Sequence, residues 1–182
     1  MSTASKSSTD ETKRASIRRA GRGDAETLAM IGARTFTETF GHLYDPADLN
    51  AFLEDKHTVA VNERLLADPA FALWLVERGD EAIGYAAAGP CDLPVPNRPR
   101  NAGELVRLYI ANDAQGGGVG GRLLGEALDW LTARFDPIYL SVYAENDGAQ
   151  RLYARHGFRK ILEYDYMVGN HADPEWIMEL KA

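Results

Sequence analysis

The feature that most constrains this chain is a turn of seven residues, Gln115 to Gly121, in which five residues are glycine. It lies between a run typical of a β-strand and an amphipathic run typical of a helix. Glycine permits positive φ angles and lets the backbone approach a ligand without an intervening Cβ atom. The first amides of a helix have no intrahelical acceptor, and with the helix dipole they bind anions. The turn therefore predicts a backbone site for an anion such as a phosphate.

Two nucleotide-binding motifs have to be weighed against this turn. Gly116, Gly118 and Gly121 fit the spacing of a dinucleotide-binding G-x-G-x-x-G. That motif normally occupies the first βα unit and is followed by several parallel strands, whereas this turn begins beyond the midpoint of 182 residues. A P-loop requires Gly-Lys-Ser/Thr, but Arg122 follows the last glycine here. A turn without any ligand remains an alternative, although its glycines cost chain entropy.

The remaining pattern predicts a mixed sheet flanked by helices. Short apolar and β-branched runs indicate strands, and apolar residues at spacings of three and four indicate helices. The expected strands are 16–19, 71–77, 82–88, 104–110, 138–143, 158–163 and 176–180. Helices are expected at 25–40, after Pro46, at 59–66, after the glycine turn and at 147–156. The order is thus one strand, helices, three strands, and then α-β-α-β-β.

Composition and charge narrow the class of protein. With 45% apolar residues, the chain can bury the core of one domain, expected over 15–182 after a flexible polar leader at 1–14. We expect no membrane span, because no apolar run approaches about 20 residues. The net charge of −7 argues against nucleic acid and is compatible with a cationic small substrate, although such charge also simply aids solubility.

The cysteine and histidine patterns predict neither a disulfide nor a metal site. Cys91 is the single cysteine, which excludes an internal disulfide and a thiolate metal cluster. His42 and His57 lack the spacing of a metal-ligand pair. We therefore expect no metal and a reducing, cytoplasmic location.

Two motifs together resemble a known family. The first is Gln115-x-x-Gly118-x-Gly120, which follows Leu108-Tyr109-Ile110. The second is Asn146-x-x-Ala149-x-x-x-Tyr153-x-x-x-Gly157-Phe158. They are similar to motifs A and B of the GNAT superfamily of N-acetyltransferases, and the resemblance covers about residues 16–180. It implies an α/β (α+β) fold with a mostly antiparallel sheet of six to seven strands. It also implies a bacterial-type acyltransferase with acetyl-CoA as co-substrate, and it is compatible with a homodimer.

The resemblance assigns a cofactor-binding role to three segments. These are the strand residues Leu108, Tyr109 and Ile110, the turn residues Gln115, Gly116, Gly117, Gly118, Val119, Gly120 and Gly121, and the later pair Asn146 and Tyr153. Tyr153 matches the family tyrosine that protonates the departing sulfur, with a core aromatic as the alternative. Asn146 could hold the pantetheine, cap the last helix, or do both.

A base is needed because a primary amine, with a pKa of about 10.4, is almost fully protonated at neutral pH. Glu104 is the first candidate, since it begins the central strand where GNAT enzymes often place a carboxylate. A surface carboxylate at a strand end is the alternative. Glu38, Glu145 and Glu163 are lesser candidates.

The acceptor is less readable from the sequence. The segments 35–42 and 49–53, Arg107 to Ile110, Tyr166-Met167 and Ile177-Met178 are similar to PaiA-type polyamine acetyltransferases, which implies spermidine or spermine as acceptor. Aromatic faces bind cations, so residues that could line the acceptor pocket are Phe36, Phe40, His42, Tyr44 and Trp74, although such residues often form core.

Other functions stay open at this point. The acceptor could be an antibiotic, an amino acid or a protein N-terminus. The domain could also sense acyl-CoA without turnover, and a nicotinamide-dependent oxidoreductase is a third reading of the glycine turn.

Overall fold

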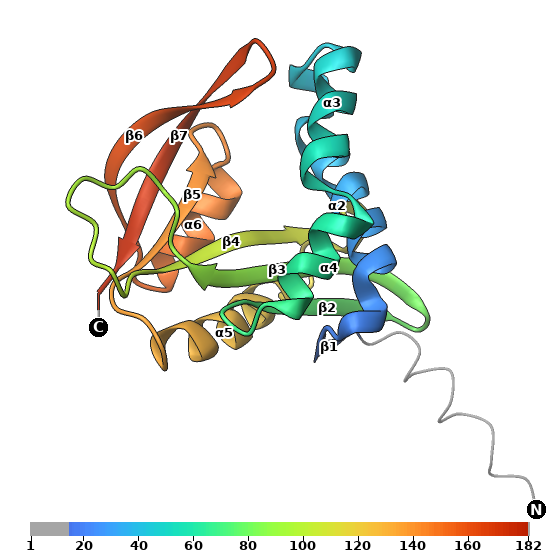
Figure 1. Ribbon diagram of the computed structural model, residues 1–182, viewed down its shortest axis with the longest axis horizontal. Helices are drawn as coiled ribbons and strands as arrows, with labels where there is room; N and C mark the ends of the chain where they lie inside the picture. The colour runs from blue at the N-terminus through green and yellow to red at the C-terminus, as the bar shows by residue number, and fades with distance from the viewer. Residues whose placement is uncertain (1–14, 182) are drawn as a thin grey trace, which may run out of the picture.

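The computed structural model describes residues 15–181, so the leader expected at 1–14 lies outside the described residues. Its centre is one seven-stranded sheet in the order β1-β2-β3-β4-β5-β7-β6. The strands are β1 (Ser16–Arg19), β2 (Ala72–Arg78), β3 (Glu81–Pro90), β4 (Gly103–Ile110), β5 (Ile138–Tyr143), β6 (Arg159–Val168) and β7 (His171–Leu180). Neighbours are antiparallel except β4 and β5. The predicted fold class and element order are confirmed (Figure 1).

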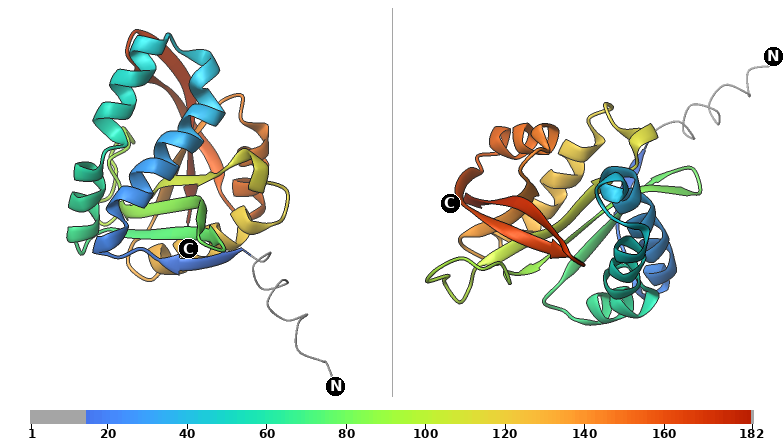
Figure 2. Two further views of the ribbon diagram at one scale, coloured as in Figure 1. Left: turned by 90° about the vertical axis from the view of Figure 1, so that its right-hand side faces the viewer. Right: turned by 90° about the horizontal axis from the view of Figure 1, so that it is seen from above.

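Three helices lie between β1 and β2, and the first and third of them cover one face of the sheet. They are α2 (Ala25–Phe40), α3 (Pro46–Lys56) and α4 (Val59–Ala67), with a 3-10 turn on each side of α2. Leu28 and Ile31 of α2 pack against Leu75 and Tyr85 of the central strands. Beyond this contact, α2 and α3 rise past the edge of the sheet, as two views show (Figures 1 and 2).

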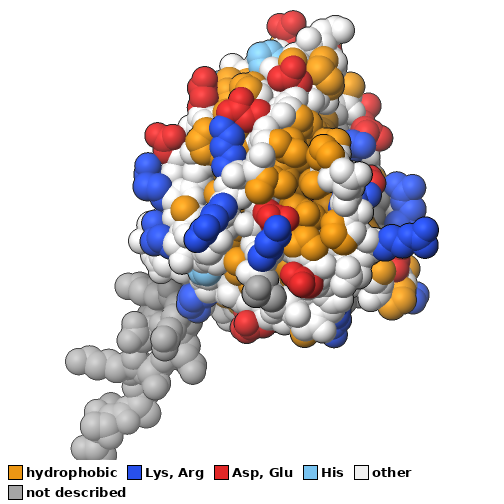
Figure 3. All heavy atoms as spheres, turned by 90° about the vertical axis from the view of Figure 1, so that its left-hand side faces the viewer, with side chains coloured by type: hydrophobic (Ala, Val, Ile, Leu, Met, Phe, Trp, Pro, Cys, Tyr) orange, Lys and Arg blue, Asp and Glu red, His pale blue; other side chains and the backbone are white. Residues whose placement is uncertain are grey.

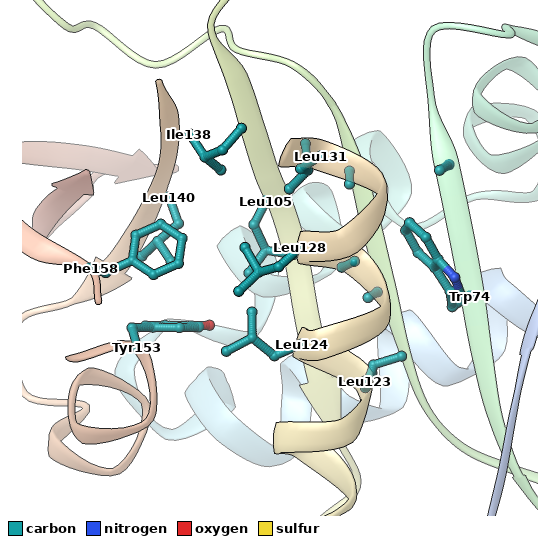
Figure 4. Close-up of a cluster of buried hydrophobic side chains, with 14 of the residues drawn as sticks. Trp74, Leu105, Leu123, Leu124, Leu128, Leu131, Ile138, Leu140, Tyr153 and Phe158 are labelled. Atoms are coloured by element: carbon teal, nitrogen blue, oxygen red, sulfur yellow. The ribbon is translucent and has the colours of Figure 1, made fainter. Parts of the chain in front are cut away.

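The opposite face is covered by α5 (Val119–Thr132) and α6 (Asp147–Arg155). The apolar stripe that predicted α5 is buried: Leu123, Leu124, Ala127 and Leu131 have 0% exposure. These side chains meet Leu105, Leu140, Tyr153 of α6 and Phe158 in the largest apolar cluster (Figure 4). The core therefore lies between α5, α6 and the centre of the sheet.

The closing hairpin is longer than the sequence predicts. β6 and β7 each have ten residues, joined at Gly169 and Asn170, against the expected 158–163 and 176–180. Along β6, partly buried Leu162, Tyr164 and Tyr166 alternate with exposed residues, which is the period of a strand. The tip of the hairpin contacts α3, where the amide of Asn170 donates to Asp48. The β6–β7 hairpin thus faces helices α2 and α3 above the sheet (Figure 2).

The edge strand β6 leaves apolar side chains at the surface. Ile161 is 42% exposed and Met167 is 56% exposed. Figure 3 views the molecule from the side of β6 and the loop after β3, and shows hydrophobic side chains gathered in one patch. Within residues 15–181, no helix combines the length and the apolar character that crossing a membrane requires.

Replacing Leu131 with alanine tests the core assignment. Leu131 lies on α5 with 0% exposure, so Leu131→Ala should lower the free energy of unfolding by about 2–5 kcal/mol through lost burial and a residual cavity. The measurement is equilibrium denaturation in urea. Asp129→Ala, at an exposed position of the same helix, is the control and should change stability by no more than about 0.5 kcal/mol. Equal losses in the two variants would contradict the packing described.

Candidate active site

The site is created by the way β4 and β5 separate. The two strands pair in parallel only at Gly103–Ile138, Glu104–Tyr139 and Leu105–Leu140. On the other side, β4 stays paired with β3 to its last residue, Ile110. The backbone groups of β4 that face β5 after Leu105 therefore have no ladder partner and are available to a ligand.

A β-bulge marks the point of separation. Ala87 of β3 is opposite Arg107, but Ala88 is opposite Leu105, so Val106 is an extra residue in β4. A bulge bends its strand and increases the local twist. The bend coincides with the last residue of β4 that pairs with β5. The bulge is thus the local feature that accompanies the opening of the sheet.

A cleft of about 380 Å³ occupies the opening. It runs from the glycine turn, along β4 and between β5 and α6, to β7 and the end of α2. The predicted cofactor residues that line it are Leu108, Tyr109, Ile110, Gln115, Gly116, Gly118, Val119, Gly120, Asn146 and Tyr153. Gly117 and Gly121 belong to the same turn but do not line the cleft. The structure therefore brings nearly all of the predicted cofactor set to one surface.

The glycine turn has the geometry of an anion site. Gly116 and Gly118 have φ angles of 84° and 73°, the left-handed region that favours glycine. A Cβ built on either one would meet no protein atom within 4 Å, so the space beside the turn is open to a ligand. Arg122 makes the first intrahelical bond, to Gly118. The amides of Val119, Gly120 and Gly121 are therefore free at the helix start.

Asn146 begins α6 and holds the far wall of the cleft. Its side-chain oxygen accepts from the amide of Ala149 at 3.1 Å, which confirms that it caps this helix. Two further bonds tie the helix to the end of β5, since the side-chain Nε2 of Gln150 donates to the carbonyls of Tyr143 and Ala144. The cap therefore fixes α6 against the strand that diverges from β4.

Tyr153 projects from α6 toward α5 across the opening. Its ring packs edge-on against Phe158, 6.0 Å away, and its phenolic oxygen lies on the side of Leu124 (Figure 4). Burial, followed by the negative charge of Glu175, raises the pKa of this phenol above its usual range. Tyr153 is therefore a neutral phenol at neutral pH and can donate its proton in a hydrogen bond.

Glu104, the first candidate for the base, does not line the cleft. It is in the part of β4 that still pairs with β5, and its carboxylate accepts from the amide of Asp92 at 2.8 Å. Only 8% of Glu104 is exposed, and this burial raises the pKa of its carboxyl. The structure thus gives Glu104 a bond to the loop after β3 and no contact with the opening.

The lesser acidic candidates also lie away from the cleft. Glu38 accepts from the amide of Asn112 and pairs with Arg34, and Glu163 pairs with Lys160 on the exposed side of β6. Glu145 is exposed beyond the end of β5. None of the three lines the cleft.

The predicted aromatic residues do not form one acceptor pocket. Phe40 lines the cleft, whereas Phe36 is 5% exposed and packs behind it. Tyr44 is buried beside Asp173, to which its hydroxyl donates. Exposed His42 is outside the cleft, and Trp74 lies beneath Trp130 on the α5 face of the sheet. His42 and Trp74 therefore do not join Phe40 at the cleft, and Trp74 lies on the face of the sheet that α5 covers.

Sequence reasoning missed the acidic residue that does line the cleft. Glu175 of β7 lies opposite Tyr143 of β5 and Tyr164 of β6. The hydroxyls of Ser141 and Tyr164 donate to its Oε2 atom. Burial raises the pKa of this carboxyl, and the two hydroxyl bonds partly oppose the rise. Its alternation with other polar residues along β7 was the available sequence signal.

No group of three or more metal-ligating side chains that could hold an ion occurs in the part of the chain that the structure describes. The cleft offers backbone amides, glycine surfaces and hydroxyls, which fit the phosphates and the amide-rich arm of coenzyme A.

Comparison with known proteins agrees with this geometry. The family model described as the acetyltransferase (GNAT) family matches residues 33–158. The chain belongs to the GNAT family. An uncharacterized N-acetyltransferase of Mycobacterium tuberculosis is 28% identical over 159 residues, which cover 85% of this chain and 96% of that protein. The N-alpha-acetyltransferase RimI of the same species is 29% identical over 153 residues, 84% of each chain.

A solved structure with the same fold contains coenzyme A. The PaiA N-acetyltransferase of Thermoplasma acidophilum in complex with coenzyme A has a TM-score of 0.73 and 20% identity, covering 93% of this chain and 99% of that one. The present chain is accordingly an acyltransferase of the GNAT fold with acetyl-CoA as its co-substrate.

The buried His57, which packs beside Phe36 and Phe52, gives a pH prediction. Burial, aided by the charge of Arg107, lowers the pKa of His57 to about 3. The unfolded chain binds this proton below about pH 6.5, whereas the folded chain does not, so stability falls as pH drops from 6.5 toward 3. Between pH 6.5 and 4.5 the wild type should lose about 2 kcal/mol more than His57→Gln in urea denaturation. Parallel losses would show that His57 is not held neutral by the fold.

Proposed function

We propose that this acyltransferase acetylates the primary amine of a small cationic acceptor by direct attack in a ternary complex. The observation that carries the proposal is the continuous cleft, which joins the glycine turn at one end to Phe40, Tyr143 and Glu175 at the other. The end at the glycine turn suits an anionic cofactor, and the end at Glu175 suits a cationic acceptor. The amine and the thioester would therefore meet between them, beside β4.

The proposed cofactor residues have separate tasks. The free amides at the start of α5 would bind the pyrophosphate, which the helix dipole also favours. The unpaired backbone edge of β4, from Leu108 to Ile110, would hold the pantetheine arm. An amide of this edge is also suited to the negative charge that develops on a carbonyl oxygen during attack.

Tyr153 is the proposed acid for the leaving sulfur. Its phenol is neutral, lines the cleft and has no hydrogen-bond partner among the described residues. A thiol has a pKa of about 8.5, so its thiolate is a tolerable leaving group even without help. Tyr153 should therefore assist the reaction without being indispensable.

The acceptor would be a polyamine or a similar small amine. Aromatic rings at the acceptor end favour a cation: the rings of Phe40 and Tyr143 meet edge-on at 5.9 Å, and those of Phe40 and Tyr109 at 6.4 Å. The likeness to PaiA supports the polyamine, and the likeness to RimI supports a protein N-terminus as the second candidate.

A panel of amines tests the proposal. Thiol release from acetyl-CoA would be followed with spermidine, spermine, lysine, an aminoglycoside and a peptide with a free N-terminus. The proposal expects release with at least one polyamine and a lower rate with the peptide. Release with the peptide alone would replace the small amine by a protein N-terminus. Tight acetyl-CoA binding without release from any amine would favour a sensor.

Filling the glycine surface tests the cofactor site. A Cβ on Gly120 would lie 3.7 Å from Ile110, at ordinary contact distance, so larger branches would enter the cleft. Gly120→Val should weaken acetyl-CoA binding by about tenfold or more, or about 1.4 kcal/mol, as measured by calorimetry. Gly125→Val is the matched control, because Gly125 lies on the same helix, in open space and outside the cleft. Equal affinity in the two variants would remove the turn from the proposed site.

A further inference from the structure

We propose that Glu175 binds the ammonium group of the acceptor and takes the proton that the amine must lose before it attacks. The proposal rests on the proposed function and names the base of that reaction. Glu175 is the only carboxylate among the described residues that line the cleft. It lies on β7, on the same side of the sheet as Tyr143 and Tyr164.

The hydrogen bonds of Glu175 leave one oxygen for a ligand. Ser141 and Tyr164 both donate to Oε2, and their hydroxyl oxygens are 3.0 Å apart, so the three groups form one cluster. No described residue donates to Oε1. An ammonium group at Oε1 would complete a hydrogen-bonded ion pair, which a partly buried carboxylate needs.

The surroundings of this oxygen select a cation over a neutral group. Phe40, Tyr109 and Tyr143 line the same end of the cleft, and their rings meet edge-on. Aromatic faces attract an ammonium group, and the attraction increases where water is excluded. The other charged residue at this end, Arg107, is held by a 3.0 Å bond to the carbonyl of Lys56.

Burial brings the proton affinities of the two partners closer together. It raises the pKa of the Glu175 carboxyl, and the same desolvation lowers the pKa of an ammonium group. The ionisable groups that interact with Glu175 are Asp173 on its own strand and five tyrosines, Tyr44, Tyr109, Tyr153, Tyr164 and Tyr166. Tyr143 lies opposite it on β5, and Arg107 lines the same cleft. Proton transfer from the amine to Glu175 is therefore less unfavourable here than in water.

The proton balance follows from this placement. The amine nitrogen loses one proton to Oε1 of Glu175 and then forms a bond to the acetyl carbon, while the bond from that carbon to sulfur breaks. The departing sulfur gains a proton from Tyr153, the proposed donor, and the second proton that the nitrogen loses passes through water to the Tyr153 phenolate and restores the phenol. Glu175 returns its proton to solvent after the products leave. The net products are the amide, the free thiol and one proton.

The test compares two carboxylates of β7. Glu175→Gln keeps the shape of the side chain and can still accept from the two hydroxyls. Glu179→Gln is the matched control, because Glu179 lies on the same strand as Glu175, accepts from the hydroxyl of Tyr139 on β5 and lies outside the cleft. With the best amine of the panel, Glu175→Gln should lower kcat/KM by about 100-fold or more, the range of general base catalysis. Glu179→Gln should stay within about twofold of the wild type, and both variants should bind acetyl-CoA normally.

A binding measurement separates this role from a structural one. Calorimetry on the complex with CoA would compare the amine with the alcohol of the same length. The amine should bind Glu175→Gln at least about tenfold more weakly than the wild type, a difference of about 1.4 kcal/mol. The alcohol should bind both proteins equally, because it carries no charge.

Three outcomes would overturn the proposal. If the wild type acetylates an amine and Glu175→Gln retains its kcat/KM and amine affinity, Glu175 is not the base and the proposed function stands. If Glu104→Gln instead abolishes turnover and Glu175→Gln does not, the base is Glu104. If the wild type acetylates no amine, the proposed function fails and this inference fails with it.

Discussion

The parallel contact between β4 and β5 is the constraint on which the rest of the site depends. It ends after three residue pairs, at Leu105 and Leu140, next to the bulge at Val106 that bends β4. Continued pairing would consume the backbone groups of β4 and close the opening. Early separation leaves a polar backbone edge in the middle of a largely buried sheet, which is costly unless a ligand or water satisfies it.

The helices hold the two strands apart rather than merely covering the sheet. α5 packs Leu124 and Leu128 against Leu105, and α6 with the turn after it brings Tyr153 and Phe158 to the same cluster (Figure 4). Because close-packed side chains fill the wedge below the opening, the strands cannot move together without expelling them. The same two helices carry the free amides of the glycine turn and the phenol of Tyr153 into the cleft. Packing and chemistry therefore share one set of elements.

The predictable parts of the molecule are those that local patterns determine. Glycines between a strand and an amphipathic helix predicted the turn at the start of α5, and Asn146 indicated the cap of α6. Strand lengths were less accessible, since Pro174 argues against the interior of a strand, yet it lies on β7 and next to Glu175. Whether a residue of β4 lies near the opening depends on where β4 and β5 separate. Two segments that are far apart in the sequence determine that point, so no local pattern shows it. For that reason the sequence could not show that Glu104 lies outside the cleft. It could not show the position of Trp74 either, because one strand alone does not reveal which helix covers each face.

Hydrogen exchange at single amides, with and without acetyl-CoA, is the sharpest test of whether the unpaired edge of β4 and the start of α5 bind the cofactor. Acetyl-CoA should slow the exchange of the amides in β4 between Val106 and Ile110 that face β5. It should also slow the exchange of the first amides of α5, Val119 to Gly121. The amides that pair β2 with β3 should exchange at unchanged rates, because they are remote from the cleft and already bonded. Protection confined to other parts of the chain, with the β4 edge and the helix start unaffected, would contradict the account.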